Sequence, residues 1–132
     1  SVVSAENTRF LVDRFRTSSS VGEQRAIVVG LARADSYDVR DFLRTLVTGN
    51  HAVCIKSDAL DALSLRRSDP VATNEVVGAL SSGDAFIRMK AAASLGRMGD
   101  RSAIPYLERV AQNDPIESVR QHARDSINDL RK

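Results

Sequence analysis

The side chains best suited to acid/base or metal chemistry lie close together in the sequence: His51, Cys54, Asp58 and Asp61. A general acid or base needs a positioned group with a shifted pKa, and zinc needs three or four close ligands. The two carboxylates stand three residues apart within an expected helix, and the other histidine, His122, is distant in sequence. We therefore expect surface carboxylates and an unreactive, buried thiol, and we predict no catalytic residue, no metal site and no cofactor.

A column of basic residues recurs every 32 positions: Lys56, Arg88 and Arg120. Such a column could bind an acidic peptide or phosphate groups. It could instead pair with acidic residues in the turns, such as Asp84 and Asp114, as a ladder of charge-assisted hydrogen bonds between neighbouring units. We favour the structural ladder, because equal spacing is what stacked units require.

The apolar residues around this column follow the same period. Ile55, Ala59 and Leu63 recur as Ile87, Ala91 and Leu95, and again as Val119, Ala123 and Ile127. Residues spaced four apart share one helix face, and no stretch shows the sustained alternation of a strand. Shorter amphipathic segments separated by turn-forming residues lie between these helices. A repeated helix-turn-helix unit of this length is typical of a solenoid.

We therefore predict an all-α fold, an α-solenoid of about four helical hairpins that form a single repeat domain over residues 1–132. The repeats are expected at about 4–34, 37–67, 70–99 and 101–131. The first repeat is divergent, because Glu23 occupies the position that is apolar in the three later repeats. The first helix of this repeat is unusually apolar for a helix at the end of a stack, with Phe10 and Phe15 five residues apart. Its apolar surface favours self-association, or further repeats, at the N-terminal end.

Residues 91–107 carry recognisable repeat motifs. An alanine-rich helix leads into Leu95-Gly96-x-x-Gly99-Asp100, and Ala103-Ile104-Pro105-x-Leu107 opens the next helix. In these features the chain resembles the HEAT repeat family, most closely the bacterial HEAT-like repeats of the phycobilisome lyase type. The resemblance implies a right-handed stack of helical hairpins, with first helices on the convex side and second helices on the concave side. Residues 65–72 lack the Gly-Asp turn and the Ile-Pro helix start of this pattern.

The variable residues of the second helices, about half a turn from the apolar stripe, are the expected surface of the concave side. Binding sites concentrate on concave surfaces, so a partner groove and simple solvent exposure both remain open readings. The candidate partner-binding residues are Ser57, Asp61, Met89, Lys90, Gln121, Arg124 and Asp125.

These observations favour a non-catalytic scaffold module that binds another protein. An alternative, carried only by the resemblance, is a bilin (phycobilin) lyase or a lyase-like subunit. Nucleic-acid binding is disfavoured, because the net charge is only +2, acidic residues occupy the candidate face and no tryptophan is available for stacking.

Composition also bears on the cellular compartment and on membrane segments. A single cysteine excludes an internal disulfide and fits a reducing compartment. No apolar run approaches the roughly 20 residues that span a bilayer, so we predict no membrane segment. We expect a cytoplasmic location, with secretion or a periplasmic location without disulfides left open.

Overall fold

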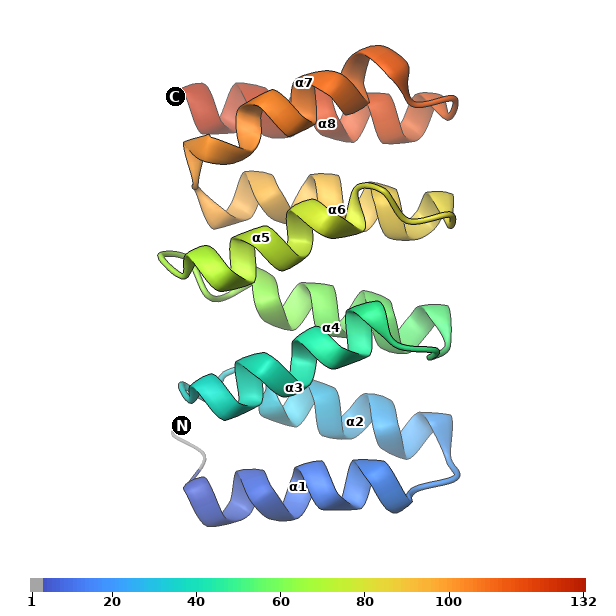
Figure 1. The fold of residues 1–132 in the computed structure, drawn as a ribbon, viewed down its shortest axis with the longest axis vertical. Helices are drawn as coiled ribbons and strands as arrows, with labels where there is room; N and C mark the ends of the chain where they lie inside the picture. Colours follow the sequence, from blue (N-terminus) through green and yellow to red (C-terminus); the bar gives the residue numbers. More distant parts are fainter. Residues whose placement is uncertain (1–3) are drawn as a thin grey trace. The chain divides into compact units, whose positions relative to one another are not determined.

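The computed structural model describes residues 4–132, and every regular element in that range is helical (Figure 1). Two compact units make up the chain, one ending at Leu63 and one running from Ser64 to Lys132. The helices are α1 (Ala5–Thr17), α2 (Val21–Leu31), α3 (Tyr37–Thr48), α4 (Val53–Ser64), α5 (Pro70–Ala79), α6 (Ala85–Met98), the short 3-10 turn η1 (Arg101–Ala103), α7 (Ile104–Asn113) and α8 (Glu117–Arg131). Whether the four helix pairs form one domain stays a prediction.

Side-chain caps fix where several helices begin. The hydroxyls of Ser4, Ser20 and Ser36 each accept a hydrogen bond from the backbone N–H three residues later, at 3.1, 3.2 and 3.0 Å. The carboxylates of Asp69 and Asp84 do the same for α5 and α6. Each cap satisfies a backbone donor that the helix itself leaves unpaired, so short polar residues set the helix starts.

In the first unit, aromatic and charged contacts tie one hairpin to the next. The Phe15 ring of α1 meets Phe42 of α3 edge to face, with ring centroids 5.2 Å apart. Arg25 of α2 donates two hydrogen bonds to the carboxylate of Asp58 in α4, at 2.8 and 3.3 Å. Glu23, which interrupts the apolar stripe, accepts a hydrogen bond from Arg14 of α1 at 3.1 Å. The polar residue therefore links α1 and α2 where an apolar contact was expected.

In the second unit, α6 packs against α5 and α8, and α7 packs against α8. The view in Figure 1 places α5 and α7 on one side of this unit and α6 and α8 on the other. The core contains the predicted stripes of both second helices, all of them buried: Ile87, Ala91, Leu95 and Met98 from α6, and Val119, Ala123, Ile127 and Leu130 from α8. The period-32 pattern thus correctly predicted which helix faces are buried.

Two small residues, Gly96 and Ser126, lie where α6 and α8 pack closely. Ser126 is buried, and its hydroxyl donates a hydrogen bond to the Ala92 carbonyl at 2.6 Å. A Cβ placed on Gly96 would lie 2.6 Å from the Ser126 hydroxyl oxygen and 3.0 Å from its Cα. A rotamer change of Ser126 could move the hydroxyl but not the Cα, so a side chain at residue 96 would force α8 to shift away from α6.

Three residues after Gly96, a second glycine of the same motif ends α6. Gly99 has a φ of 74°, the left-handed conformation that typically closes a helix. A side chain there would be strained, and its Cβ would also meet the Arg67 guanidinium at 2.8 Å. The two glycines of the motif therefore have different roles, one in packing and one in chain reversal.

We predict that Gly96→Ala destabilises the protein by about 2 kcal/mol, because the added methyl group must push α8 away from α6. Gly78→Ala is the matched control, since Gly78 also lies in a helix and a Cβ there would meet nothing within 4 Å. That variant should gain about 0.5–1 kcal/mol from helix propensity. Urea unfolding followed by circular dichroism measures both, and equal effects at the two glycines would contradict the close approach.

Candidate functional site

Arg88 holds two neighbouring hairpins of the second unit together. Its Nε and Nη2 donate to the two carboxylate oxygens of Asp114 at 2.7 and 3.2 Å, and its Nη1 donates to the Ser82 carbonyl at 3.0 Å. The side chains of Arg88 and Asp114 are only 14% and 6% exposed. A bidentate, largely desolvated pair of this kind is among the stronger polar contacts in proteins. Its position indicates a structural role.

Arg120 repeats part of this geometry in α8. Its Nη1 donates to the Asp114 carbonyl at 2.6 Å, six residues back, just as Arg88 reaches the Ser82 carbonyl six residues back. Its remaining donors face the carboxylate of Glu117 on the same helix. In both repeats the arginine therefore fastens its helix to the turn that precedes it.

The charge of Arg88 also sets the titration of its partner. The hydrogen bond from Arg88 lowers the pKa of Asp114, opposed by burial, with further lowering from the Ile116 N–H and from the charges of Arg88 and Arg120. The same hydrogen bond raises the pKa of Arg88. The ion pair is consequently formed throughout the neutral range.

Arg88 and Asp114 form one pair of the predicted ladder, and pairing at the other repeats stays a prediction. Asp84 caps α6 by accepting a hydrogen bond from the Ile87 N–H at 3.1 Å, and its charge also helps to raise the pKa of Arg88. A pairing of Asp84 with a neighbouring hairpin stays a prediction. The residue 32 positions before Asp114 is Ser82, which has no charge. Lys56 is half-buried on α4. The shared feature is the basic residue, while the carboxylate belongs to one repeat.

The structure corrects one of the candidate partner-binding residues. Ser57 is buried, at 8% exposure, so it cannot form part of an exposed binding face. Asp61 on α4 and Met89 and Lys90 on α6 are half-buried. The other three candidates lie on α8, where Gln121 and Asp125 are exposed and Arg124 is half-buried.

On α8 these candidates bind one another. Arg124 donates to Glu117 at 2.6 Å and to Gln121 at 2.8 Å, and Gln121 donates to Asp125 at 2.9 Å. Glu117 was not among the predicted residues, although its spacing of three and seven from Arg120 and Arg124 is that of helix neighbours. We call Glu117, Gln121, Arg124 and Asp125 the α8 network.

The adjoining helix α6 exposes apolar surface. Phe86, in its first turn, is 46% exposed, and Met89 lies three residues later on the same side of the helix. Lys90 follows directly. An exposed aromatic ring thus lies beside a half-buried methionine and lysine on a helix that packs against α8, a combination that suits a protein-binding surface.

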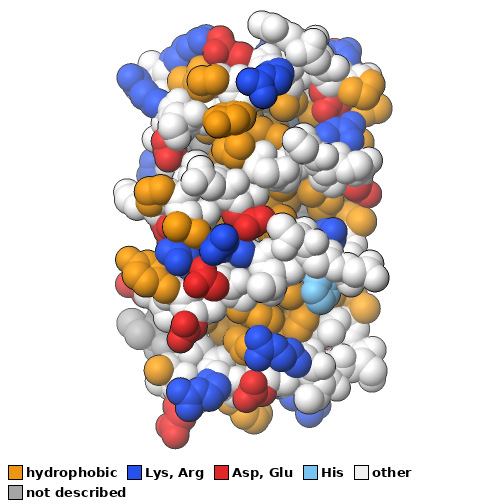
Figure 2. Space-filling model, in the orientation of Figure 1, with side chains coloured by type: hydrophobic (Ala, Val, Ile, Leu, Met, Phe, Trp, Pro, Cys, Tyr) orange, Lys and Arg blue, Asp and Glu red, His pale blue; other side chains and the backbone are white. Residues whose placement is uncertain are grey.

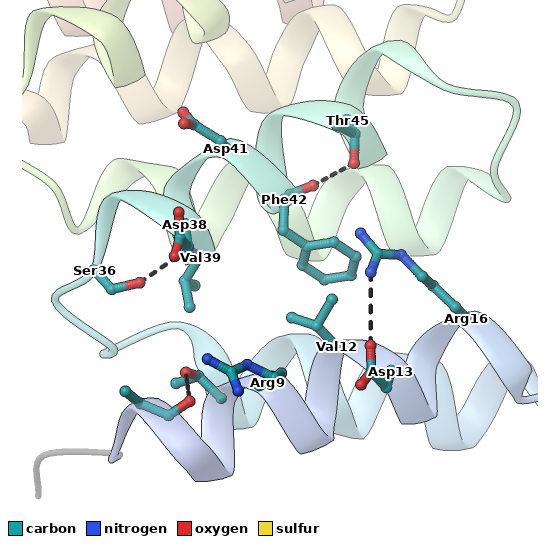
Figure 3. A pocket seen from close by; sticks show the side chains of 12 residues that line it. Arg9, Val12, Asp13, Arg16, Ser36, Asp38, Val39, Asp41, Phe42 and Thr45 are labelled. Atoms are coloured by element: carbon teal, nitrogen blue, oxygen red, sulfur yellow. Dashed lines mark hydrogen bonds and ion pairs between the residues drawn. The ribbon is translucent and has the colours of Figure 1, made fainter.

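Two grooves between first helices were not predicted from the sequence. In the first unit, Val12, Val39 and Phe42 line a cavity of about 460 Å³ between α1 and α3, and Figure 3 shows Arg16 reaching over the Phe42 ring. In the second unit, Val77 and Tyr106 line one of about 470 Å³ between α5 and α7. Figure 2 shows apolar side chains among charged ones on the face that it views.

The residues considered for catalysis have structural partners. Asp58 is bound by Arg25, and the His51 ring lies 5.9 Å from that of Phe15. Cys54 is half-buried. Within residues 4–132, no group of three or more His, Cys, Asp or Glu side chains is arranged to hold a metal ion.

Residues 55–128, more than half of the sequence, match the HEAT repeat family. The chain belongs to the HEAT repeat family. Together with the helical hairpins, this confirms the predicted all-α fold of the α-solenoid class. No helix in the described part of this HEAT repeat protein is long and apolar enough to cross a membrane.

No curated protein matches the chain in sequence. Among solved structures, human deoxyhypusine hydroxylase in complex with glycerol is similar to this HEAT repeat protein, with a TM-score of 0.81 and 15% sequence identity. The match covers 98% of this chain and 45% of that chain. At such low identity the likeness is one of fold.

We predict that Asp114→Asn destabilises the HEAT repeat protein by about 3 kcal/mol at pH 7, because Arg88 loses its buried counter-charge. The lowered pKa of Asp114 means that its contribution is present above the unfolded value of about 4 and is lost as pH falls through the folded value. The difference between wild type and variant should therefore shrink below about pH 4.

Asp129→Asn is the control, because Asp129 is an exposed carboxylate paired only loosely with Lys132 at 3.4 Å. Its stability change should stay within about 0.5 kcal/mol at both pH values. Denaturant midpoints at pH 7 and pH 3 test the prediction. A cost for Asp114→Asn that is the same at both pH values would contradict it.

Proposed function

We propose that this chain is a non-catalytic protein-binding module that contacts its partner through the outer sides of α6 and α8. The observation that carries the proposal is the exposed Phe86 with the half-buried Met89 on α6, which packs against the helix that carries the polar α8 network. Aromatic residues and methionine are enriched where proteins bind one another, and an aromatic ring that becomes buried can dominate the affinity.

The α8 network supports this proposal through its rigidity. Because Arg124 is already held by Glu117 and Gln121, and Gln121 holds Asp125, these side chains lose little conformational freedom when a partner covers them. They would form a polar rim beside the apolar pair. An amphipathic helix with an apolar stripe and flanking charges of both signs is the partner chemistry that such a surface fits.

Two alternatives follow from the comparisons and the resemblance. A bilin lyase or lyase-like subunit of the phycobilisome type would hold a tetrapyrrole, and the likeness to a hydroxylase leaves an enzymatic role as a competing proposal. Nucleic-acid binding is disfavoured, because Asp125 and Glu117 stand among the basic residues of the same face and would repel phosphate.

We predict that Phe86→Ala and Met89→Ala each weaken capture of the partner at least about tenfold, because each removes apolar contact at the centre of the surface. Tyr106→Ala is a matched control, since Tyr106 has the same 46% exposure as Phe86 but lies on α7. The measurement is affinity capture from the source cells, followed by titration of the captured protein against all three variants.

Equal loss of binding for Phe86→Ala and Tyr106→Ala, or no loss for either α6 variant, would contradict the assignment of the surface. Mixing the purified protein with phycocyanobilin addresses the enzymatic alternative. An absorbance shift that Phe86→Ala abolishes would replace the scaffold proposal with a bilin-binding one.

A further inference from the structure

Arg109 supplies the charge of the groove between α5 and α7. Of the residues that line this cavity of about 470 Å³, only Arg109 and Asp114 are charged. Asp114 is buried and neutralised by its pair with Arg88. The Arg109 guanidinium lies over the Tyr106 ring, 5.8 Å from its centroid, and no carboxylate within residues 4–132 is paired with it. The groove therefore offers a positive charge to a ligand.

The contact with Tyr106 leaves this guanidinium able to bind an anion. An aromatic face attracts the positive charge without using any N–H donor. The donors of Arg109 thus stay available to a carboxylate, which a guanidinium can bind through two parallel hydrogen bonds. The ring also restricts the motion of a long side chain, so less conformational freedom is lost when a ligand binds.

The walls of the groove are apolar. Val77 and Val110 line it from opposite helices and are half-buried, and Leu80 lines it as well. Tyr106 is 46% exposed, so most of its ring edge is open to a ligand. A cavity of this size with mostly apolar walls and few polar groups is typical of binding sites. A large apolar side chain of a ligand would lose water against these walls.

Gly78 keeps part of the groove open. It lies within α5, it is exposed, and a Cβ built on it would meet nothing within 4 Å. Glycine destabilises a helix relative to alanine, yet no neighbour in the described part of the chain requires a glycine there. A missing side chain on the wall of a groove allows the close approach of a ligand.

The groove of the first unit does not offer the same chemistry. Arg16 lies over the Phe42 ring at 5.7 Å, but it is also paired with Asp13 at 3.7 Å. Asp38 and Asp41 line that groove as well. A ligand carboxylate would be repelled by these acidic groups. The two grooves therefore differ in the charge of the ligand that they favour.

We propose that the α5–α7 groove binds an acidic segment of a partner protein, in which a glutamate or aspartate lies next to a large apolar side chain. The carboxylate pairs with Arg109, and the apolar side chain packs against Val77, Val110 and Tyr106. The site is separate from the α6–α8 surface and does not depend on the function proposed for it. A nucleic acid fits less well, because its backbone binds through many cations and this groove supplies one from Arg109.

The probe is a display library of short random peptides, selected on the purified full chain. Only peptides that bind wild type and Phe86→Ala equally are kept, so ligands of the α6 surface are set aside. The peptides that remain should carry an acidic residue next to a large apolar one. A library that yields no such peptide, or one that yields basic peptides, would overturn the proposal whatever the fate of the α6–α8 surface.

Titration of the best peptide against variants locates its site. Arg109→Gln and Tyr106→Ala should each weaken binding about tenfold. Arg16→Gln is the matched control, because Arg16 is also exposed and lies over an aromatic ring, but in the other groove. It should change the affinity less than about twofold. Equal effects of the two arginine substitutions would overturn the assignment.

Changing the carboxylate of the peptide to an amide tests its pairing with Arg109. The change should weaken binding to wild type about tenfold and leave binding to Arg109→Gln unaltered, because the pair is already broken there. A loss of the same size against both proteins would show that the carboxylate binds elsewhere, and would overturn the proposed pairing.

Gly78→Leu separates binding from folding. Leucine is a better helix former than glycine, and the space beside Gly78 is open, so the urea midpoint should not fall. The added side chain occupies the groove, so the peptide should bind at least about tenfold more weakly. Unchanged affinity in this stable variant would overturn the placement of the peptide.

A fluorescent single-stranded oligonucleotide tests the choice of ligand. It should not displace the peptide at physiological salt. Displacement that Arg109→Gln abolishes would overturn the proposed occupant and assign the groove to a nucleic acid.

Discussion

The guanidinium of Arg88 is the contact on which the second unit most depends. Its planar fork donates to both oxygens of Asp114 and to the Ser82 carbonyl from three separate nitrogens, a bidentate geometry that the single nitrogen of a lysine does not reproduce. The pair fixes α6 relative to the turn before α8. This arrangement of α6 and α8 is the one in which Gly96 packs against Ser126. It also holds Phe86 and Met89 on a helix of fixed position.

The same constraint explains why the repeated basic residues are poor candidates for ligand binding. Arg88 and Arg120 have their donors engaged by backbone carbonyls and neighbouring carboxylates. A ligand phosphate or carboxylate would have to displace these partners before it could bind. The proposed recognition surface therefore uses positions that differ between repeats, such as Phe86 and Gln121, and not those that recur.

The sequence predicted the fold well because burial in a repeat follows a period. Ile87 and Val119 could be placed in the core from spacing alone, since a helix stripe must face its neighbours. Ser57 was placed incorrectly, because its burial depends on the angles between helices, which the period does not encode. The capping role of Asp84 depends on local geometry, which the period does not encode either. The Gly96–Ser126 approach and the grooves between first helices likewise arise from distances between separate helices, so no single-helix pattern indicated them.

The most direct test of this account is a double-mutant cycle between Arg88→Ala and Asp114→Ala, measured by denaturant unfolding at neutral pH. If the pair joins the two hairpins, the stability losses should be strongly non-additive, with a coupling of about 2 kcal/mol. Additive losses, with a coupling below about 0.3 kcal/mol, would show that the two side chains act independently and would contradict the structural role given to the basic column.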